Sequence, residues 1–223
     1  MAFWRKVLAI TRKDIISEFR AREIIGSVLV FVLLVILIFN FAFGAANEVI
    51  SKTAPGMLWV TFAFAGVLSL NRAFIMEKEE GCLEGLMVAP ISRDIIYAGK
   101  MLSCLVFLLV VEVIALPIFA FLFNLNVFSG EILIITLLST VGFVACGTLF
   151  SALAVKTRAR ELVLPVLFLP IVIPVIICAV KATGLAMEGK SWTDITNWLL
   201  IIGSFDLIFL VISFWVFSFV IEE

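Results

Sequence analysis

The sequence of 223 residues contains no histidine, only four cysteines and one tyrosine, and charged residues make up 15% of it. Without histidine, the chain lacks the commonest metal ligand and the usual proton shuttle near neutral pH. The cysteines show no CxxC spacing, so disulfide, zinc and thiol-redox chemistry have no support. A serine or cysteine nucleophile needs a nearby base, and the largest group of acids lies in one polar segment. Catalysis by this chain is therefore not expected.

Long apolar runs are what the sequence has in abundance. Hydrophobic residues make up 64% of the chain, which leaves too little polar surface to cover a soluble domain of this length. Six runs are almost free of charge, and each is near the roughly 20 residues that a helix needs to cross a bilayer. They are Ile24–Phe43, Thr53–Asn71, Met101–Leu122, Ile132–Val155, Leu162–Val180 and Trp198–Ile221. We predict an all-α integral membrane protein with six transmembrane helices in residues 24–223.

The basic residues divide unevenly between the two sides of these spans. With the N-terminus inside, 13 of the 16 Lys and Arg residues fall on inner segments. Only Lys52, Lys181 and Lys190 fall on outer loops. Because Lys and Arg are retained on the cytoplasmic side during insertion, this distribution places both termini in the cytoplasm.

Residues 1–23 form a candidate amphipathic helix that precedes the first span. Its apolar set is Phe3, Trp4, Val7, Leu8, Ile15, Ile16 and Phe19, and basic residues lie between them. Such a helix lies along a lipid interface, with aromatic and aliphatic side chains in the membrane and basic groups at the phosphates. Contact with a partner protein is the alternative.

The longest polar stretch is the inner loop 72–100. Glu77, Glu80 and Glu84 fall on one helical face, and Leu83 and Leu86 belong to an apolar set with Met76 and Met87. Gly81 permits a close backbone approach, and Pro90 ends the helix. Ser92 is expected to cap the next helix, whose first turn carries Asp94. These features indicate a cytoplasmic docking element, with a solvated charged loop as the alternative.

Two acids lie within the predicted spans. An intramembrane carboxylate is a functional candidate because it is costly to keep in hydrocarbon. Glu112 and Asp206 have similar predicted depths, so we expect them to face one cavity or to hydrogen-bond within the bundle, with one or both protonated.

Prolines and small residues indicate how two of the spans pack. Pro165, Pro170 and Pro174 predict a kinked or partly re-entrant fifth span. Small residues in the fourth predict close helix packing. Trp59, Trp192 and Trp198 are expected to form an outer aromatic belt.

One nucleotide-binding pattern is present but has the wrong context. Gly184, Gly189, Lys190 and Ser191 match GxxxxGK[ST]. A phosphate loop follows a buried strand and opens a helix in a domain of βαβ units, whereas this match joins two spans on the outer side. We interpret it as a chance match.

The pattern Glu80-Gly81-x-Leu83-Glu84-x-Leu86-x-x-x-Pro90, with Gly99-Lys100 after it, resembles the coupling segment of ABC-2-type permeases. Over essentially its whole length, the chain resembles the cytochrome c maturation protein B family, the haem exporter B permeases. Other residues that carry this resemblance are Ala54-Pro55-Gly56-x-Leu58-Trp59-Val60, Leu164-Pro165 and Pro170-x-x-x-Pro174-Val175-Ile176. The sequence departs from the family pattern at Asn71, where an acid is common, and at Ala89, where a serine is common.

The resemblance implies an ABC-2, type V exporter-like permease fold in the bacterial inner membrane. It implies four partners: a cytoplasmic ABC ATPase that binds the ATP, a second copy of the chain, a haem-handling membrane protein, and a periplasmic haem chaperone that ATP hydrolysis releases. The coupling residues it implies are Glu77, Glu80, Gly81, Leu83, Glu84, Leu86 and Pro90. No nucleic acid, metal or cofactor is expected on this chain, and the lack of histidine argues against ligation of haem iron.

Two other functions remain compatible with the sequence. One is a passive membrane scaffold that holds maturation proteins together without using the loop at 72–100. The other is an ABC-2 exporter of a different amphiphilic substrate.

Overall fold

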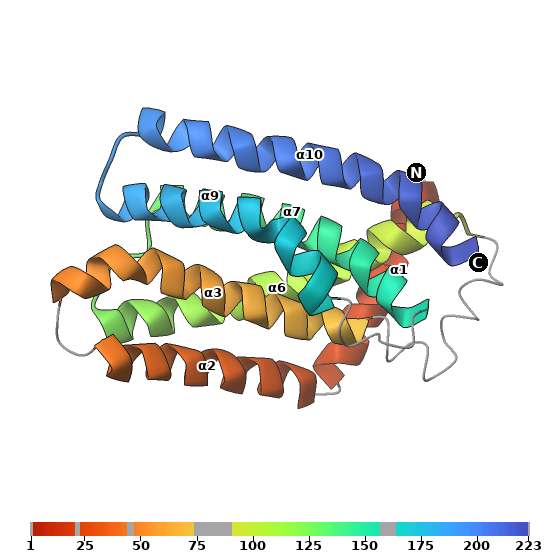
Figure 1. The fold of residues 1–223 in the computed structure, drawn as a ribbon. Helices are drawn as coiled ribbons and strands as arrows, with labels where there is room; N and C mark the ends of the chain where they lie inside the picture. Colours follow the sequence, from red (N-terminus) through yellow and green to blue (C-terminus); the bar gives the residue numbers. More distant parts are fainter. Residues whose placement is uncertain (1, 21–22, 44–46, 74–90, 157–163, 223) are drawn as a thin grey trace.

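The computed structural model describes residues 2–20, 23–43, 47–73, 91–156 and 164–222, and these are helical apart from short links (Figure 1). The helices are α1 (Ala2–Arg20), α2 (Glu23–Phe43), α3 (Asn47–Ala73), α6 (Arg93–Phe123), α7 (Gly130–Lys156), α9 (Leu169–Met187) and α10 (Trp192–Glu222), with a π-helical turn η1 (Leu164–Phe168) before α9. Six of the helices, α2 to α10, are long and apolar enough to cross a membrane. The predicted all-α fold with six spans is confirmed.

Three spans begin six or more residues earlier than the apolar runs predict. The second begins at Asn47 rather than at Thr53, the third at Arg93 rather than at Met101, and the sixth at Trp192 rather than at Trp198. In the third and sixth spans an acidic residue, Asp94 or Asp194, lies in the first turn, where the positive end of the helix dipole stabilises negative charge. The helices therefore continue beyond the hydrocarbon-length segment.

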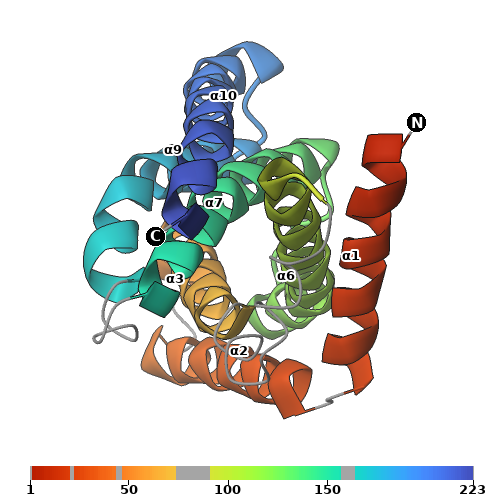
Figure 2. The same ribbon diagram turned by 90° about the vertical axis from the view of Figure 1, so that its right-hand side faces the viewer.

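The six spans run alternately in opposite directions, so the chain ends meet at one end of the bundle (Figure 1). We call this the termini end. It includes α1, the start of α6 and the end of α10, whereas the links from α6 to α7 and from α9 to α10 lie at the opposite end. Seen along the spans, α1 runs across their direction beside α6 (Figure 2). The predicted helix at residues 1–23 is present as α1, which ends at Arg20, and its position at a lipid interface stays a prediction.

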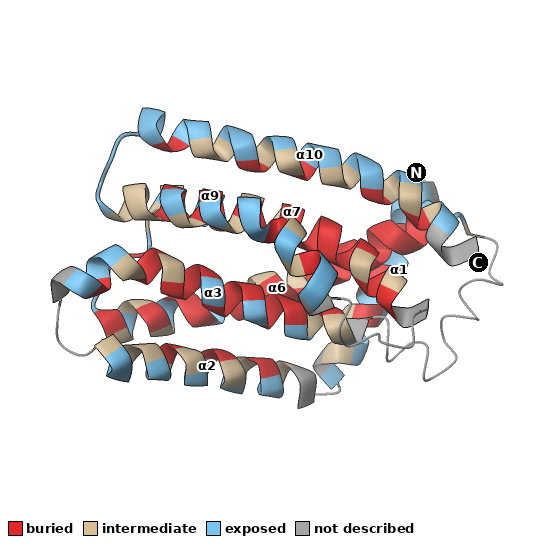
Figure 3. Cartoon of the chain, viewed as in Figure 1, coloured by how far each residue is buried: buried red, intermediate tan, exposed pale blue. Residues whose placement is uncertain are grey.

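The fourth span, α7, is the packing centre of the bundle. It contacts α3, α6, α9 and α10, and most residues of its span are buried, as the visible part of α7 shows (Figure 3). Gly147 faces Leu70 and Phe168 so closely that a Cβ would overlap Leu70. The predicted close packing through small residues is confirmed, since a larger side chain at 147 would separate the helices.

The fifth span is irregular at its start. Its first turn is π-helical, and the helix then continues from Leu169 to Met187 with Pro174 inside it. The predicted interruption is thus a short π-helical turn. Its wider hydrogen-bond pattern accommodates the prolines, which have no backbone N–H to donate. The re-entrant alternative finds no support in this continuous helix.

One of the predicted belt residues, Trp59, is buried inside the bundle. Trp59 is only 5% exposed, and its indole N–H donates to Thr183 Oγ1 at 2.9 Å, so its assignment to an outer belt is wrong. An aromatic residue near the end of an apolar run is equally suited to packing inside the bundle.

The GxxxxGK[ST] match lies at the end of α9 and in the following turn, with Gly184 inside the helix and Gly189 at a positive φ of 68°. No strand precedes it in the part of the chain described.

Candidate functional site

A buried ion pair joins the helix at the termini end to the third span. Asp14 of α1 accepts from the ammonium of Lys100 at 2.9 Å, and both side chains are almost fully buried. The hydroxyl of Ser103 lies 3.4 Å from the same carboxylate oxygen, Asp14 Oδ2. Lys13, which is half-exposed, approaches the other oxygen at 3.1 Å. A buried carboxylate is tolerated in such a place because cations and a hydroxyl surround it.

The joint between α1 and α6 also has a close backbone approach. The Thr11 hydroxyl lies 3.1 Å from the carbonyl oxygen of Gly99, and a Cβ on Gly99 would lie 2.8 Å from side-chain atoms of Ile10. Val7 and Ile10 bury their side chains on this face. We call the contact of Asp14 and Thr11 with Gly99, Lys100 and Ser103 the α1–α6 joint. It fixes α1 to the first turns of α6 through three contacts at one place: the ion pair of Asp14 with Lys100, the hydrogen bond of Thr11 to Gly99, and the close fit of Gly99 against Ile10.

The predicted coupling residues Glu77, Glu80, Gly81, Leu83, Glu84, Leu86 and Pro90 lie outside the described residues. The helix after them does begin where the sequence predicts, since Ser92 is the N-cap of α6. The Ser92 side chain makes no capping hydrogen bond, and the backbone N–H of Ile95 donates to its carbonyl oxygen instead. The α6 residues of the α1–α6 joint, Gly99 to Ser103, therefore lie within about three turns of the helix start that follows the predicted coupling segment.

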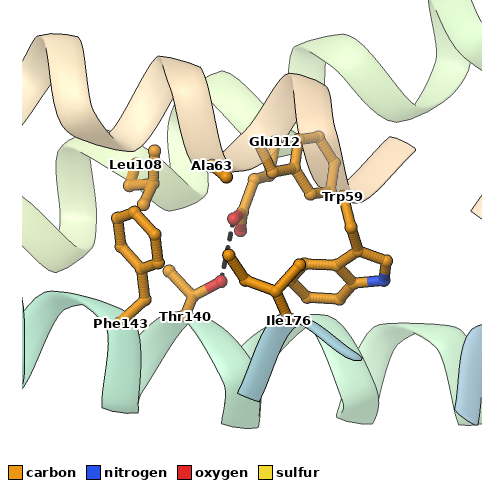
Figure 4. Close-up of a pocket in the computed structure, with 8 residues that line it drawn as sticks. Trp59, Ala63, Leu108, Glu112, Thr140, Phe143 and Ile176 are labelled. Carbon is orange, nitrogen blue, oxygen red and sulfur yellow. Dashed lines mark hydrogen bonds between the residues drawn. The ribbon is translucent and has the colours of Figure 1, made fainter. Parts of the chain in front are cut away.

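Glu112 lies in a small cavity between four spans (Figure 4). The cavity is lined by Trp59, Phe62, Ala63, Leu108, Glu112, Thr140, Phe143 and Ile176. Glu112 is 2% exposed, and its Oε1 lies 2.8 Å from the Thr140 hydroxyl. Its Oε2 has no hydrogen-bond partner among the described residues. An acid with one free buried oxygen is a candidate functional group.

Asp206 meets α7 on another side. Its carboxyl group packs against Gly142, where a Cβ would overlap Oδ1, and the residue is 4% exposed. Neither carboxyl oxygen has a hydrogen-bond partner in the described part of the chain. Asp206 does not line the Glu112 cavity. Of the two alternatives for these acids, the shared cavity is not found, and Glu112 hydrogen-bonds within the bundle instead, because equal depth does not fix which side of a helix each acid faces.

The α1–α6 joint is a feature that the sequence patterns do not predict. The charge distribution assigns Lys100 only to the inner side, and Asp14 stands among basic residues on a helix that pattern alone places at a lipid surface. One signal in the sequence does point to the joint, since Asp14 and Thr11 share a helical face with Val7, at spacings of three and four residues. No group of three or more His, Cys, Asp or Glu side chains gathers within the described ranges.

Six apolar helices, with α7 as the close-packed centre and α1 tied across one end, define a multi-pass membrane protein. The chain belongs to the CcmB protein family, whose model matches residues 5–222.

The chain is also similar to relatives named Heme exporter protein B, among them those of three organisms. That of Rhodobacter capsulatus is 32% identical over 186 residues, covering 81% of this chain and 85% of its own. That of Pseudomonas aeruginosa is 29% identical, with 81% and 82% covered. That of Haemophilus influenzae is 30% identical, with 80% and 82% covered. The resemblance inferred from sequence motifs is confirmed.

Proposed function

We propose that this chain is the permease subunit of an ABC transporter complex in c-type cytochrome biogenesis. A partner ATPase binds and hydrolyses ATP, and this chain transmits the resulting motion to haem handling or to release of a periplasmic haem chaperone. The observation that carries the proposal is family membership over residues 5–222, together with relatives named as heme exporters. The chain itself supplies no ATPase site in this scheme.

The arrangement of the helices supports a route for that motion. Segment 74–90 links α3 to α6, and both helices meet it at the termini end. In the first three turns of α6 after this segment, the α1–α6 joint ties the start of the third span to α1 through a buried ion pair. A push on the coupling segment would therefore displace α1 and the start of α6 as one unit, because breaking the joint would leave charge in a buried site.

Orientation and assembly complete the proposal. The described basic residues at the termini end are Arg5, Lys6, Arg12, Lys13, Arg20, Arg72, Arg93, Lys100 and Lys156, against Lys52, Lys181 and Lys190 at the opposite end. This bias supports a bacterial inner-membrane protein with both termini in the cytoplasm, where the ATPase is. Six spans are half the usual complement of such a transporter, so two copies with two ATPase chains form the complex, beside a haem-handling membrane protein.

The test is ATP hydrolysis by the reconstituted complex when Glu80, Gly81 and Glu84 are all changed to Ala. We expect the ATPase chain to be lost on purification, or its hydrolysis to become independent of this subunit. The matched control is Glu188→Ala with Lys190→Ala, two exposed residues at the opposite end, which leaves both properties unchanged.

Two other outcomes would replace the proposal. Unchanged ATPase binding and turnover in the triple variant would favour a passive scaffold. ATP-driven movement of another amphiphile, with no effect on release of the haem chaperone, would favour an exporter of a different substrate.

A further inference from the structure

The cavity beside Glu112 has the size and chemistry of a site for one water molecule. Its volume is about 10 Å³, which is room for about one water. Seven of the eight lining residues are buried, and Ile176 is half-buried. The cavity is apolar except at Glu112, Thr140 and the ring of Trp59. The Trp59 N–H already donates to Thr183, which leaves Glu112 Oε2 as the free polar atom.

The hydrogen bonds around Thr140 indicate where a proton lies. Thr140 Oγ1 is 2.8 Å from Glu112 Oε1 and 2.7 Å from the carbonyl oxygen of Thr136. A hydroxyl group has one hydrogen and can donate only once. If Glu112 were ionised, Thr140 would have to share its single proton between two acceptors, the carboxylate and the Thr136 carbonyl oxygen. If Glu112 is protonated, its O–H donates to Thr140 and the Thr140 O–H donates to the carbonyl oxygen of Thr136, so each contact has its own hydrogen.

The remaining contents of the cavity agree with a neutral acid. The aromatic rings of Trp59, Phe62 and Phe143 line it, and the Trp59 N–H is already bonded to Thr183, so these rings offer no donor that would stabilise a buried carboxylate. A metal cation such as Na⁺ or Mg²⁺ requires several oxygen ligands, whereas the lining side chains offer only Glu112 and Thr140. An organic ammonium group is larger than the space for one water.

We propose that Glu112 is held as a neutral carboxylic acid that binds one water molecule at Oε2. The water donates to Oε2, the acid donates from Oε1 to Thr140, and Thr140 donates to the Thr136 carbonyl oxygen. This hydrogen-bonded chain joins α6 to α7 in the middle of the membrane and keeps a proton there. The site does not depend on the proposed role in haem export.

Infrared difference spectroscopy of the full chain in lipid, wild type minus Glu112→Gln, tests the proposal. We expect loss of a protonated-carboxyl C=O band together with a water O–H band that shifts in H₂¹⁸O. The matched control is Glu188→Gln at an exposed acid, which should remove carboxylate bands instead. Thr140→Val keeps the acid and should shift the C=O band, so the proposal stays testable if Glu112→Gln does not fold.

Two results would overturn the inference. Loss of carboxylate bands in Glu112→Gln would show that Glu112 is ionised. The absence of any band sensitive to H₂¹⁸O would show that the cavity is dry. Neither result depends on an ATPase, so failure here is separable from failure of the coupling experiment.

Discussion

Two of the buried polar contacts of the third span, α6, are built in different ways. Near its start, Lys100 meets Asp14 of α1, and the two charges pair at 2.9 Å. Further along the same helix, Glu112 meets only the hydroxyl of Thr140 on α7. A charge is tolerated near the membrane edge, where a counter-charge and half-exposed Lys13 are available, but in mid-bundle an acid has only neutral partners. The first joint is therefore ionic, and we infer that the second is neutral.

Breaking the ionic joint should have the largest effect. Lys100→Met removes the buried cation and leaves the buried Asp14 carboxylate with Lys13 as its ionic partner. We expect a loss of about 3 kcal/mol of stability, because an incompletely compensated buried charge is costly. Thermal unfolding in detergent measures it. The double variant Asp14→Leu with Lys100→Met should recover most of the loss, and a double variant as unstable as the single one would show that packing, not charge, dominates the joint.

The contact of Asp206 with α7 gives the next largest effect and extends the comparison to a third acid. Gly142→Ala places a Cβ against Asp206 Oδ1, and we expect a cost of about 1–3 kcal/mol from overpacking. The matched control is Gly203→Ala, at a helical glycine where an added Cβ would meet no atom within 4 Å, and it should be neutral or slightly stabilising. Equal unfolding midpoints for the two variants would mean that Asp206 moves away from α7 at little cost.

The neutral joint should respond least. Thr140→Val removes the hydroxyl that contacts Glu112, and we expect a loss of about 1 kcal/mol, the net value of one hydrogen bond. Thr148→Val is the control, because Thr148 is equally buried on α7 but its hydroxyl bonds only to the carbonyl oxygen of Val144 in its own helix. Similar losses in denaturant-induced unfolding would show that the bond to Glu112 adds nothing to the link between α6 and α7.

Some features of this fold follow directly from residue pattern. The six spans are predictable because a bilayer imposes one length on every apolar helix. The irregular start of the fifth span is predictable because each proline removes a backbone donor. Close packing of the fourth span follows from its small residues, of which Gly142 and Gly147 do meet neighbouring side chains.

Other features depend on partners that are distant in the chain. The sequence pattern places Trp59 at a lipid-facing belt, but it is buried and bonded to Thr183. The same kind of pattern places Asp14 on a surface helix, although it pairs with Lys100 of the third span. A helical pattern gives the spacing of side chains along one element, and it carries no information about which distant element covers a given face.

The sequence by itself determined the class of this protein, the number of its spans and the family to which it belongs. These properties depend on apolar length, on the distribution of Lys and Arg, and on short motifs, all of which are local. Only the tertiary structure decided that Asp14 pairs with Lys100, that Glu112 faces Thr140, and that Asp206 rests on Gly142. The physical reason is that a buried polar group is satisfied by whatever lies opposite it, and packing between distant segments sets that neighbour.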